Sequence, residues 1–115
     1  MPMLKLQTSA PLSEEQRNTL LPTLSKLVAE SIGKPEQYVM VTVETASILM
    51  AGKAGPAALA EVRSIGGLNG RVNSQLSQKL CTLLEQTLGI PASRVYINFA
   101  NVPADHWGWN GNTFG

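Results

Sequence analysis

The chain contains the same hydrophobic pattern twice, 56 residues apart. The first copy is Leu20, Leu24, Leu27, Val28 and Ile32, and the second is Leu76, Leu80, Leu83, Leu84 and Leu88. Spacings of i, i+4, i+7, i+8 and i+12 place each set on one face of an α-helix. Each set is followed by Gly and, two residues later, by Pro, a common signal for a helix end. The pattern therefore predicts two amphipathic helices that end near Ile32 and Leu88.

Short alternating segments flank both predicted helices. Hydrophobic residues occupy every second position in 39–43 and 95–99, after the helices, and in 3–8, ahead of the first helix. A shorter candidate strand, 61–65, lies ahead of the second helix. A period of two residues is typical of strands with one buried face. Each half of the chain is therefore predicted to be a βαβ unit, with pseudo-repeats at about 2–44 and 58–100 inside a single domain, 1–115.

Three local features add detail to these elements. Ser13 and Gln16 fit a capping box at the start of the first helix. Pro22 lies inside that helix, where its missing backbone donor predicts a kink or a later helix start. The connection 45–60 is long for a loop, and its apolar segment 48–50 predicts a short extra strand.

Two βαβ units predict an α+β fold, a βαββαβ subunit with a four-stranded mixed sheet. Right-handed crossovers place both helices on the same face of this sheet. The opposite face is left uncovered, and it carries Met3, Lys5, Gln7, Met40, Thr42, Tyr96 and Asn98. These residues are too mixed for a buried core and too apolar for a purely solvated surface. We therefore expect the uncovered face to meet copies of the same chain in a closed homo-oligomer.

Composition excludes several broad classes of protein. With 115 residues, 43% apolar residues, 15% charged residues and a net charge of +1, the chain is of ordinary globular type. Its nine basic residues are scattered, which argues against nucleic acid as a partner. No apolar run is long enough to span a membrane, and the first residues lack the features of a signal peptide. The expected location is the cytoplasm.

Cysteine and histidine limit the available chemistry further. One cysteine, Cys81, excludes an internal disulfide, and together with the single His106 it leaves too few ligands for a structural zinc site. A serine or cysteine triad would also need a histidine, and His106 stands in a tryptophan-rich tail. No metal and no cofactor are expected.

Pro2 is the most informative candidate for catalysis. Removal of Met1 would leave a secondary amine at the head of the first strand. Burial and a nearby cation both lower the pKa of an amine, since both disfavour its charged form. Ordinary α-amino groups titrate at about 7.7–8.0, so a modest decrease makes the neutral base available near pH 7. A proline in second position is also a common start residue without any function.

Several motifs, in order along the whole chain, are similar to those of a known family. They are Pro2-Met3, Gly33-Lys34-Pro35, Gln37-Tyr38, Ser64-Ile65-Gly66, the segment 94–98, Gly108-Trp109-Asn110 and Thr113-Phe114. In these motifs the chain resembles the macrophage migration inhibitory factor (MIF) family of the tautomerase superfamily. The resemblance implies a homotrimer with sites at the subunit boundaries. It also implies an isomerase, a phenylpyruvate tautomerase, acting on a small 2-keto acid or its enol.

The resemblance assigns roles to the first group of site residues. It implies that Pro2 is the base that moves a proton between carbon and oxygen. Lys34 would bind the substrate carboxylate and help keep the Pro2 amine neutral. Ile65 would offer its backbone N–H to the same carboxylate, next to the flexible pair Gly66-Gly67. Read alone, Lys34 is a solvated helix-end lysine, and the glycine-rich turn lacks the Lys and Ser/Thr of a phosphate-binding loop.

The resemblance also implies a second group, supplied by the neighbouring subunit. Tyr96 and Asn98 share one sheet face and would reach the far end of the substrate, although ordinary interface residues would show the same pattern. Tyr38, Trp107 and Trp109 would form an aromatic mouth. Phe114 is expected to anchor the C-terminus.

The chain departs from the animal cytokines of the family at two places, the segment 56–60 and Trp107. Ala57 and Ala60 replace a Cys-x-x-Cys pair, so thiol–disulfide activity is not expected. Cys81 is predicted to be a buried structural thiol. Trp107 replaces a small aliphatic residue and is expected to narrow the site for bulky rings.

Two other functions stay open at this point. One is a signalling or binding protein with a residual tautomerase site, for which the family analogy would also allow non-classical secretion. The other is a different reaction of the superfamily, such as decarboxylation or dehalogenation. No second base or acid beside Pro2 is apparent to support the latter.

Overall fold

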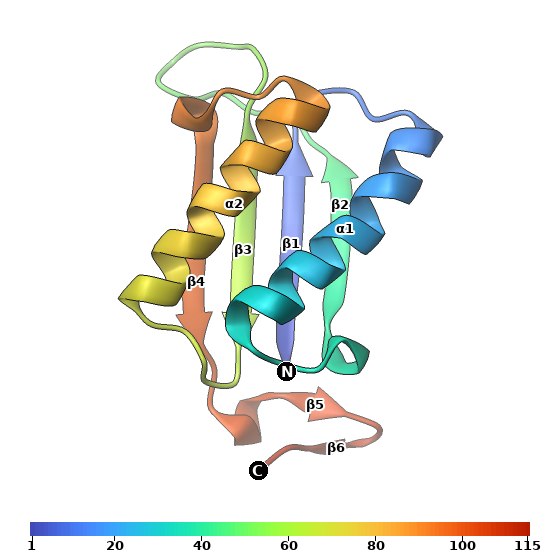
Figure 1. The fold of residues 1–115 in the computed structure, drawn as a ribbon, viewed down its shortest axis with the longest axis vertical. Coiled ribbons are helices and arrows are strands. Elements are labelled where there is room, and N and C mark those ends of the chain that lie inside the picture. Colours follow the sequence, from blue (N-terminus) through green and yellow to red (C-terminus); the bar gives the residue numbers. More distant parts are fainter.

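Each half of the chain folds into the strand–helix–strand unit that the hydrophobic pattern predicts (Figure 1). The computed structural model describes residues 1–115. The main elements are β1 (Pro2–Thr8), α1 (Glu14–Ile32), β2 (Met40–Thr45), β3 (Ala58–Ser64), α2 (Gly70–Leu88) and β4 (Val95–Asn101). Three 3-10 turns, Glu36–Tyr38, Ala92–Arg94 and Ala104–His106, and a small hairpin of β5 (Gly108–Trp109) and β6 (Asn112–Thr113) complete the chain. The expected α+β class and βαββαβ order are confirmed.

The sheet joins the two halves side by side. Its strand order is β2-β1-β3-β4. β1 runs parallel to β2, and β3 runs parallel to β4, as expected within βαβ units. β1 and β3 are antiparallel, which makes the sheet mixed. In this central pairing Pro2 lies opposite Ser64, at one end of the sheet.

The ends of the helices follow their sequence signals. The Ser13 hydroxyl accepts the Gln16 backbone N–H (3.0 Å), and the Gln16 side-chain oxygen accepts the Ser13 N–H (2.9 Å), so the capping box forms. The helix begins at Glu14 and continues through Pro22 to Ile32, so a later start does not occur. Gly33 ends α1 with φ 75°, the left-handed conformation that glycine adopts without strain.

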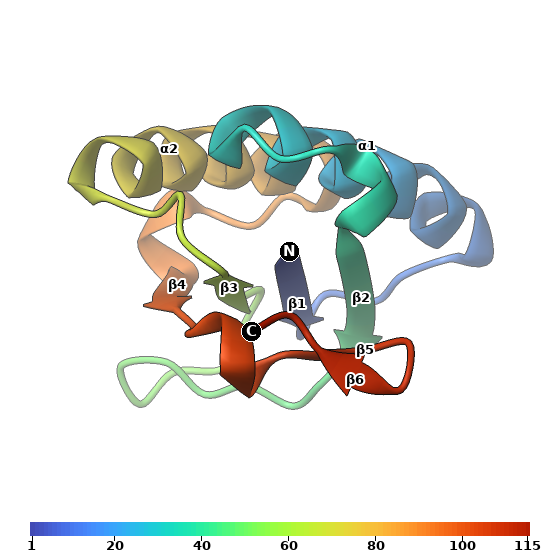
Figure 2. The same ribbon diagram turned by 90° about the horizontal axis from the view of Figure 1, so that it is seen from below.

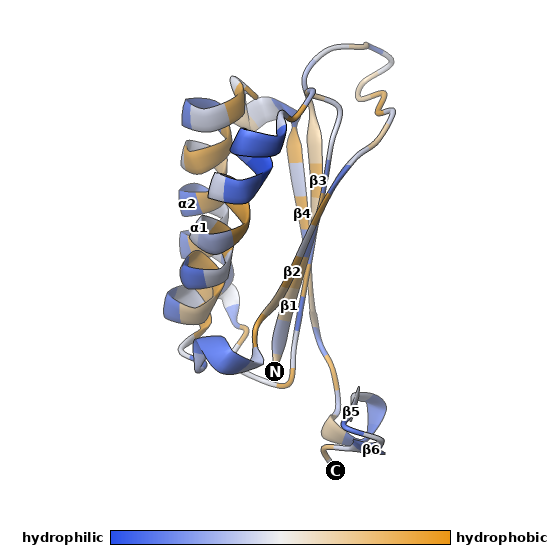
Figure 3. Cartoon of the chain, turned by 90° about the vertical axis from the view of Figure 1, so that its right-hand side faces the viewer, coloured by the Kyte–Doolittle hydropathy of each residue, from blue (hydrophilic) through white to orange (hydrophobic).

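The core lies between the helices and one face of the sheet. Figure 3 shows both helices on the same side of the strands. Buried side chains from both layers form this core, among them Leu4, Leu6, Leu24, Val28, Val62, Leu76, Leu80 and Leu84. The opposite sheet face has no cover in this chain, and it exposes Met40 (65%) and Tyr96 (67%). The predicted uncovered face is therefore present.

Two connections differ from the sequence-based expectation. The segment 48–50 forms no strand, because Met50 pairs only with Lys53 across a tight turn. Ala51 (φ 55°) and Gly52 (φ 72°) form this turn, and two positive φ values are typical of a two-residue hairpin loop. β3 begins at Ala58, three residues earlier than expected, and ends at Ser64. No helix combines the length and the apolar character that crossing a membrane would need.

Candidate functional site

Pro2 is the first residue of β1, and Figure 2 shows the N-terminus of the chain between α1 and the β5–β6 hairpin. The Pro2 side chain is fully buried and lies on the helix-facing side of β1. The Ile65 backbone N–H donates to the Met1 carbonyl oxygen (3.3 Å), one residue outside the Pro2–Ser64 pair. Bonds placed in this way leave Pro2 and Ser64 as a non-hydrogen-bonded pair, in which side chains approach most closely. The Ser64 hydroxyl is buried beside Pro2 and has no hydrogen-bond partner.

The positive charge of Lys34 acts on the amino group at the chain terminus. Lys34 follows the helix-ending Gly33, and its backbone N–H donates to the Ala29 carbonyl oxygen (3.0 Å), so the end of α1 fixes its position. The pKa of the Met1 amino group is lowered, first by burial and second by the positive charge of Lys34. An amine at this point of the fold therefore loses its proton more readily than an ordinary terminal amine.

Gly67 makes room for the Lys34 side chain. A Cβ atom at Gly67 would lie 3.4 Å from Lys34 Cε and 2.9 Å from Ile32 Cγ2, and the residue has φ +82°. Gly66 has a similar φ of +73°, but a Cβ atom there would meet nothing within 4 Å. Substitution of Gly66 therefore tests backbone strain alone, whereas substitution of Gly67 tests backbone strain together with close packing.

Gly67→Ala should destabilise the protein more than Gly66→Ala. Both variants strain a left-handed backbone, but only Gly67→Ala also overpacks the end of α1, which should cost about 1–3 kcal/mol more. Urea unfolding of both variants at one protein concentration measures the difference. Equal losses of unfolding free energy would show that the contact with Ile32 has no energetic effect.

Two of the three aromatic residues expected at the mouth of the site, Tyr38 and Trp109, are in contact with each other. Tyr38 contacts Trp109 edge to face (centroids 6.3 Å apart), and Trp109 stacks on Phe114 (5.6 Å, 9°). The Phe114 N–H donates to the Trp107 carbonyl oxygen (3.2 Å), which anchors the C-terminus as expected. The Trp107 side chain makes neither ring contact and instead lines a hollow with Met3 and Arg63.

Tyr96 and Asn98 lie far from Pro2 within one chain. Both are exposed on the uncovered face, whereas the Pro2 ring faces the helices. Asn98 is three residues from Asn101, which aligns with Pro2 through Ser64. Strand geometry then puts the Cα atoms of Asn98 and Pro2 about 14 Å apart. One subunit brings together Pro2, Lys34 and Ile65, but not Tyr96 or Asn98.

Two residues beside Pro2 were not singled out from the sequence as site residues. Ser64 is the strand partner of Pro2, and Arg63 is the partner of Met3. Ser64 stands in one of the family motifs, and otherwise both residues are marked only by their place near the end of a candidate strand. Their proximity to Pro2 depends on the register between β1 and β3, which the alternation of residues does not determine.

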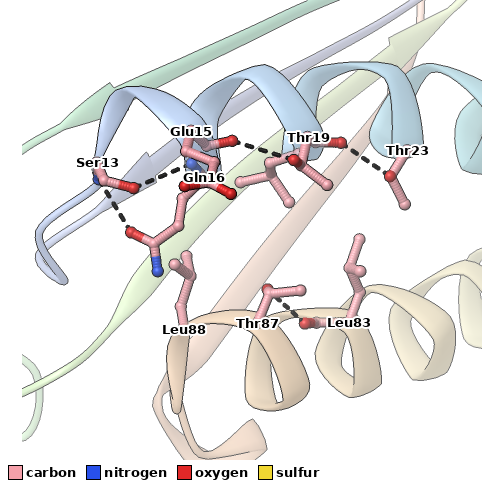
Figure 4. Close-up of a pocket in the computed structure, with 9 residues that line it drawn as sticks. Ser13, Glu15, Gln16, Thr19, Thr23, Leu83, Thr87 and Leu88 are labelled. Atoms are coloured by element: carbon pink, nitrogen blue, oxygen red, sulfur yellow. Dashed lines mark hydrogen bonds between the residues drawn. The ribbon is translucent and has the colours of Figure 1, made fainter.

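A groove between the two helices is the other notable hollow (Figure 4). It has a volume of about 240 Å³ and lies beside Ser13, at the opposite end of α1 from Lys34. The Thr19, Thr23 and Thr87 hydroxyls that line it donate to helix carbonyl oxygens four residues earlier. Because these three hydroxyls are bonded within their own helices, none of them is free to act as a nucleophile in the groove.

The remaining reactive side chains lie apart from Pro2. Cys81 is partly exposed rather than buried, since it lies on the side of α2 between the core and the solvent. Burial nevertheless raises the pKa of its thiol, which lowers its reactivity near neutral pH. Ala57, directly before β3, and Ala60, within it, are both buried. No group of three His, Cys, Asp or Glu side chains has the arrangement of a metal site.

Known proteins are similar to this chain over nearly its whole length. A family model described as macrophage migration inhibitory factor (MIF) matches residues 1–115. The macrophage migration inhibitory factor homologue of Trichuris trichiura is 39% identical over 115 residues, which are 99% of this chain and 100% of its own length. The factor from Xenopus laevis is 36% identical and is matched over 99% of both chains.

Solved structures show the same fold. The macrophage migration inhibitory factor homologue of Prochlorococcus marinus has a TM-score of 0.93 and 44% identity, over 98% of this chain and 99% of its own. Another solved protein, inactivated by 2-oxo-3-pentynoate, has a TM-score of 0.85 and 27% identity, over 96% of this chain and 94% of its own. Sequence and fold thus agree over nearly the full length of the relatives. The chain belongs to the macrophage migration inhibitory factor family.

Proposed function

We propose that this protein is a keto–enol tautomerase of phenylpyruvate-like 2-oxo acids, with Pro2 as its general base. After removal of Met1, the neutral Pro2 amine takes a proton from the carbon next to the keto group. The electron pair of that C–H bond forms the C=C bond of the enol, the keto oxygen takes a proton from water, and the protonated amine releases its proton to the solvent. In the opposite direction the protonated amine returns its proton to carbon. No redox step and no external reactant are needed, so the reaction is an isomerisation.

The contacts of Met1 are the observation that carries this proposal. The Met1 carbonyl oxygen accepts the Ile65 N–H, and the charge of Lys34 acts on the Met1 amine. A backbone donor and a cation at one position are suited to a carboxylate. Removal of Met1 therefore frees the Pro2 nitrogen, the Ile65 N–H and the space near Lys34 in a single step. A 2-oxo acid can then place its carboxylate there with its adjacent carbon near the amine.

A relative that is inactivated by 2-oxo-3-pentynoate supports this class of substrate. The compound is a 2-oxo acid whose alkyne is electron-poor, so a neutral amine can add to it. Incubation of this protein with the compound should increase its mass by one molecule of inactivator, located on the peptide that begins with Pro2. Turnover of phenylpyruvate should be lost in parallel. Absence of turnover in a sample shown to begin at Pro2 would refute the proposed function.

The complete site is proposed to be shared between subunits of a homotrimer. Tyr96 and Asn98 lie about 14 Å or more from Pro2 in their own chain, on a face without cover. A neighbouring copy packed at that face would place them at the far end of the substrate. There the Asn98 amide would hydrogen-bond a polar substituent, and the Tyr96 ring would pack against an aromatic group.

Mixed trimers should recover part of the activity that two variants lack. Pro2→Gly and Asn98→Ala each remove one half of the proposed site, so boundaries that pair an intact Pro2 with an intact Asn98 should be active. The two variants are unfolded and refolded together and compared with the average of the separately refolded proteins. Light scattering must show trimers throughout. A mixture no more active than that average would contradict a site built across the subunit boundary.

A signalling or binding role is the alternative function. It is supported by the name macrophage migration inhibitory factor, which the relatives carry. A variant without turnover but with an unchanged fold, such as Pro2→Gly, separates the two functions. Retention of the biological effect by that variant would favour binding.

A further inference from the structure

A hollow on the uncovered sheet face lies next to the proposed site. It has a volume of about 260 Å³ and is lined by Met3, Arg63, Val102, His106, Trp107 and Gly108. The hairpin and the turn before it approach the sheet on this side (Figure 3). The hollow therefore lies between the end of the sheet and the C-terminal segment.

The pairing of β1 and β3 connects this hollow to Pro2. Met3 directly follows Pro2, Arg63 directly precedes Ser64, and the two are strand partners. Because side chains alternate along a strand, Pro2 and Ser64 face the helices while Met3 and Arg63 face the hollow. The Pro2 amine would thus have a cation on each side of the sheet, Lys34 at the end of α1 and Arg63 in the hollow.

Arg63 has no acidic partner in this chain. The side-chain ion pairs within 4.0 Å are Lys5 with Glu44 and His106 with Asp105. Glu61 lies two residues away on the same face and lines a neighbouring hollow together with Arg63, but no ion pair within 4.0 Å joins the two side chains. An unpaired guanidinium is suited to bind a carboxylate through two parallel hydrogen bonds. Met3, Val102 and Trp107 supply apolar surface for the part of a ligand that leads to it.

We infer that Arg63 is a specificity-determining residue that selects 2-oxo acids carrying a second anionic group at the end remote from the reacting carbon. The inference rests on the proposed function, because Lys34 and Ile65 then hold the 2-oxo acid end near Pro2. Arg63 binds the second carboxylate, and Trp107 packs against the segment between the two charges. The proton transfer itself is unchanged. Trp107 therefore shapes the site for an elongated dianionic substrate rather than only narrowing it.

Two substrates with the same reacting centre test this inference. Phenylpyruvate and its ring-carboxylated analogue differ only in a remote negative charge. The wild-type protein should prefer the carboxylated compound by about tenfold or more in kcat/KM, as one charge-assisted hydrogen bond allows. Arg63→Gln should lose far more activity on the carboxylated compound than on phenylpyruvate, mainly through KM, so that the preference falls to nearly one. An unchanged preference in Arg63→Gln would overturn the inference.

Lys79→Gln is the matched control, because it removes one positive charge from an exposed position on α2. It should leave the preference as in the wild type. A similar fall of the preference in Lys79→Gln would mean that net charge, and not Arg63, sets it. Failure of the proposed function is distinct, since phenylpyruvate would then not be turned over at all. In that case, tryptophan fluorescence measures the affinity of the wild-type protein for phenylpyruvate and for the carboxylated analogue. Equal affinities for the two compounds would overturn the inference.

Discussion

Pro2→Gly is expected to lower kcat/KM for phenylpyruvate by about 10²–10⁴-fold, the usual contribution of a general base. Glycine keeps a free α-amine but loses the ring that is buried against Ser64 and fixes the direction of the nitrogen. The absorbance of the enol measures kcat/KM for both the wild-type and the Pro2→Gly protein. Mass spectrometry must show that both proteins lack Met1, because a retained Met1 would inactivate either of them. Full activity of a verified Pro2→Gly protein would exclude Pro2 as the base.

The pH dependence gives a second measure of the same assignment. Burial and Lys34 lower the pKa of the amine at this end of the chain. A base acts when it is deprotonated, so kcat/KM should rise with pH and level off above a pKa lower than the usual 7.7–8.0 or so of an α-amine. Lys34→Gln should move this pKa upward, since it removes a like charge. A profile governed only by a group that titrates well above the usual range would contradict a base activated in this way.

A protein that retains Met1 should also be nearly inactive, but for an additional reason. Its Pro2 nitrogen is an amide and not a base, so at least the same general-base contribution of about 10²–10⁴-fold is lost. The Met1 carbonyl oxygen also occupies the Ile65 N–H that the substrate carboxylate needs. Release of the chain from an N-terminal fusion by a protease, to begin at either Met1 or Pro2, provides the two proteins to compare.

Binding of a substrate analogue that cannot react separates these two effects. The Pro2→Gly protein should bind the analogue with nearly wild-type affinity, because Lys34 and Ile65 are intact and free. The chain that begins at Met1 should bind it much more weakly, because the same anion site is occupied. Equal affinities for the Met1 and Pro2 forms would show that the carboxylate binds elsewhere.

The repeat in the sequence predicted most of the fold. Leu76, Leu80 and Leu84 mark the buried face of α2, and the glycine and proline that follow them set its end. The connection 46–57 could not be predicted in the same way, because apolar residues at Ile48 and Leu49 suggest a strand whether or not a partner strand exists. In the chain itself they have no partner, and Leu49 is 70% exposed.

The candidate site could be predicted for those residues that lie at the ends of helices and strands. Pro2 begins a strand, Lys34 follows a helix and Ile65 follows a strand, and the βαβ order brings these three points to one edge of the sheet. Arg63 could not be recognised, because its position opposite Met3 depends on strand register. The direction of Trp107 is likewise a result of the way the C-terminal hairpin folds back.

The hydrogen bond from Ile65 to Met1 has a twin at the other end of the molecule. The two halves of the chain are offset by 56 residues, so Ile65 corresponds to Ser9, and Met1 corresponds to Ala57. The Ser9 N–H donates to the Ala57 carbonyl oxygen (3.0 Å), just as the Ile65 N–H donates to that of Met1. Ala57 is an internal residue that no aminopeptidase can remove, so that end of the sheet stays permanently closed. The two halves of the fold thus contain equivalent hydrogen bonds, one at each end of the sheet. Removal of Met1 can break only the bond from Ile65 and so free only the Ile65 N–H. This asymmetry would explain how a nearly twofold-symmetric subunit comes to have one site.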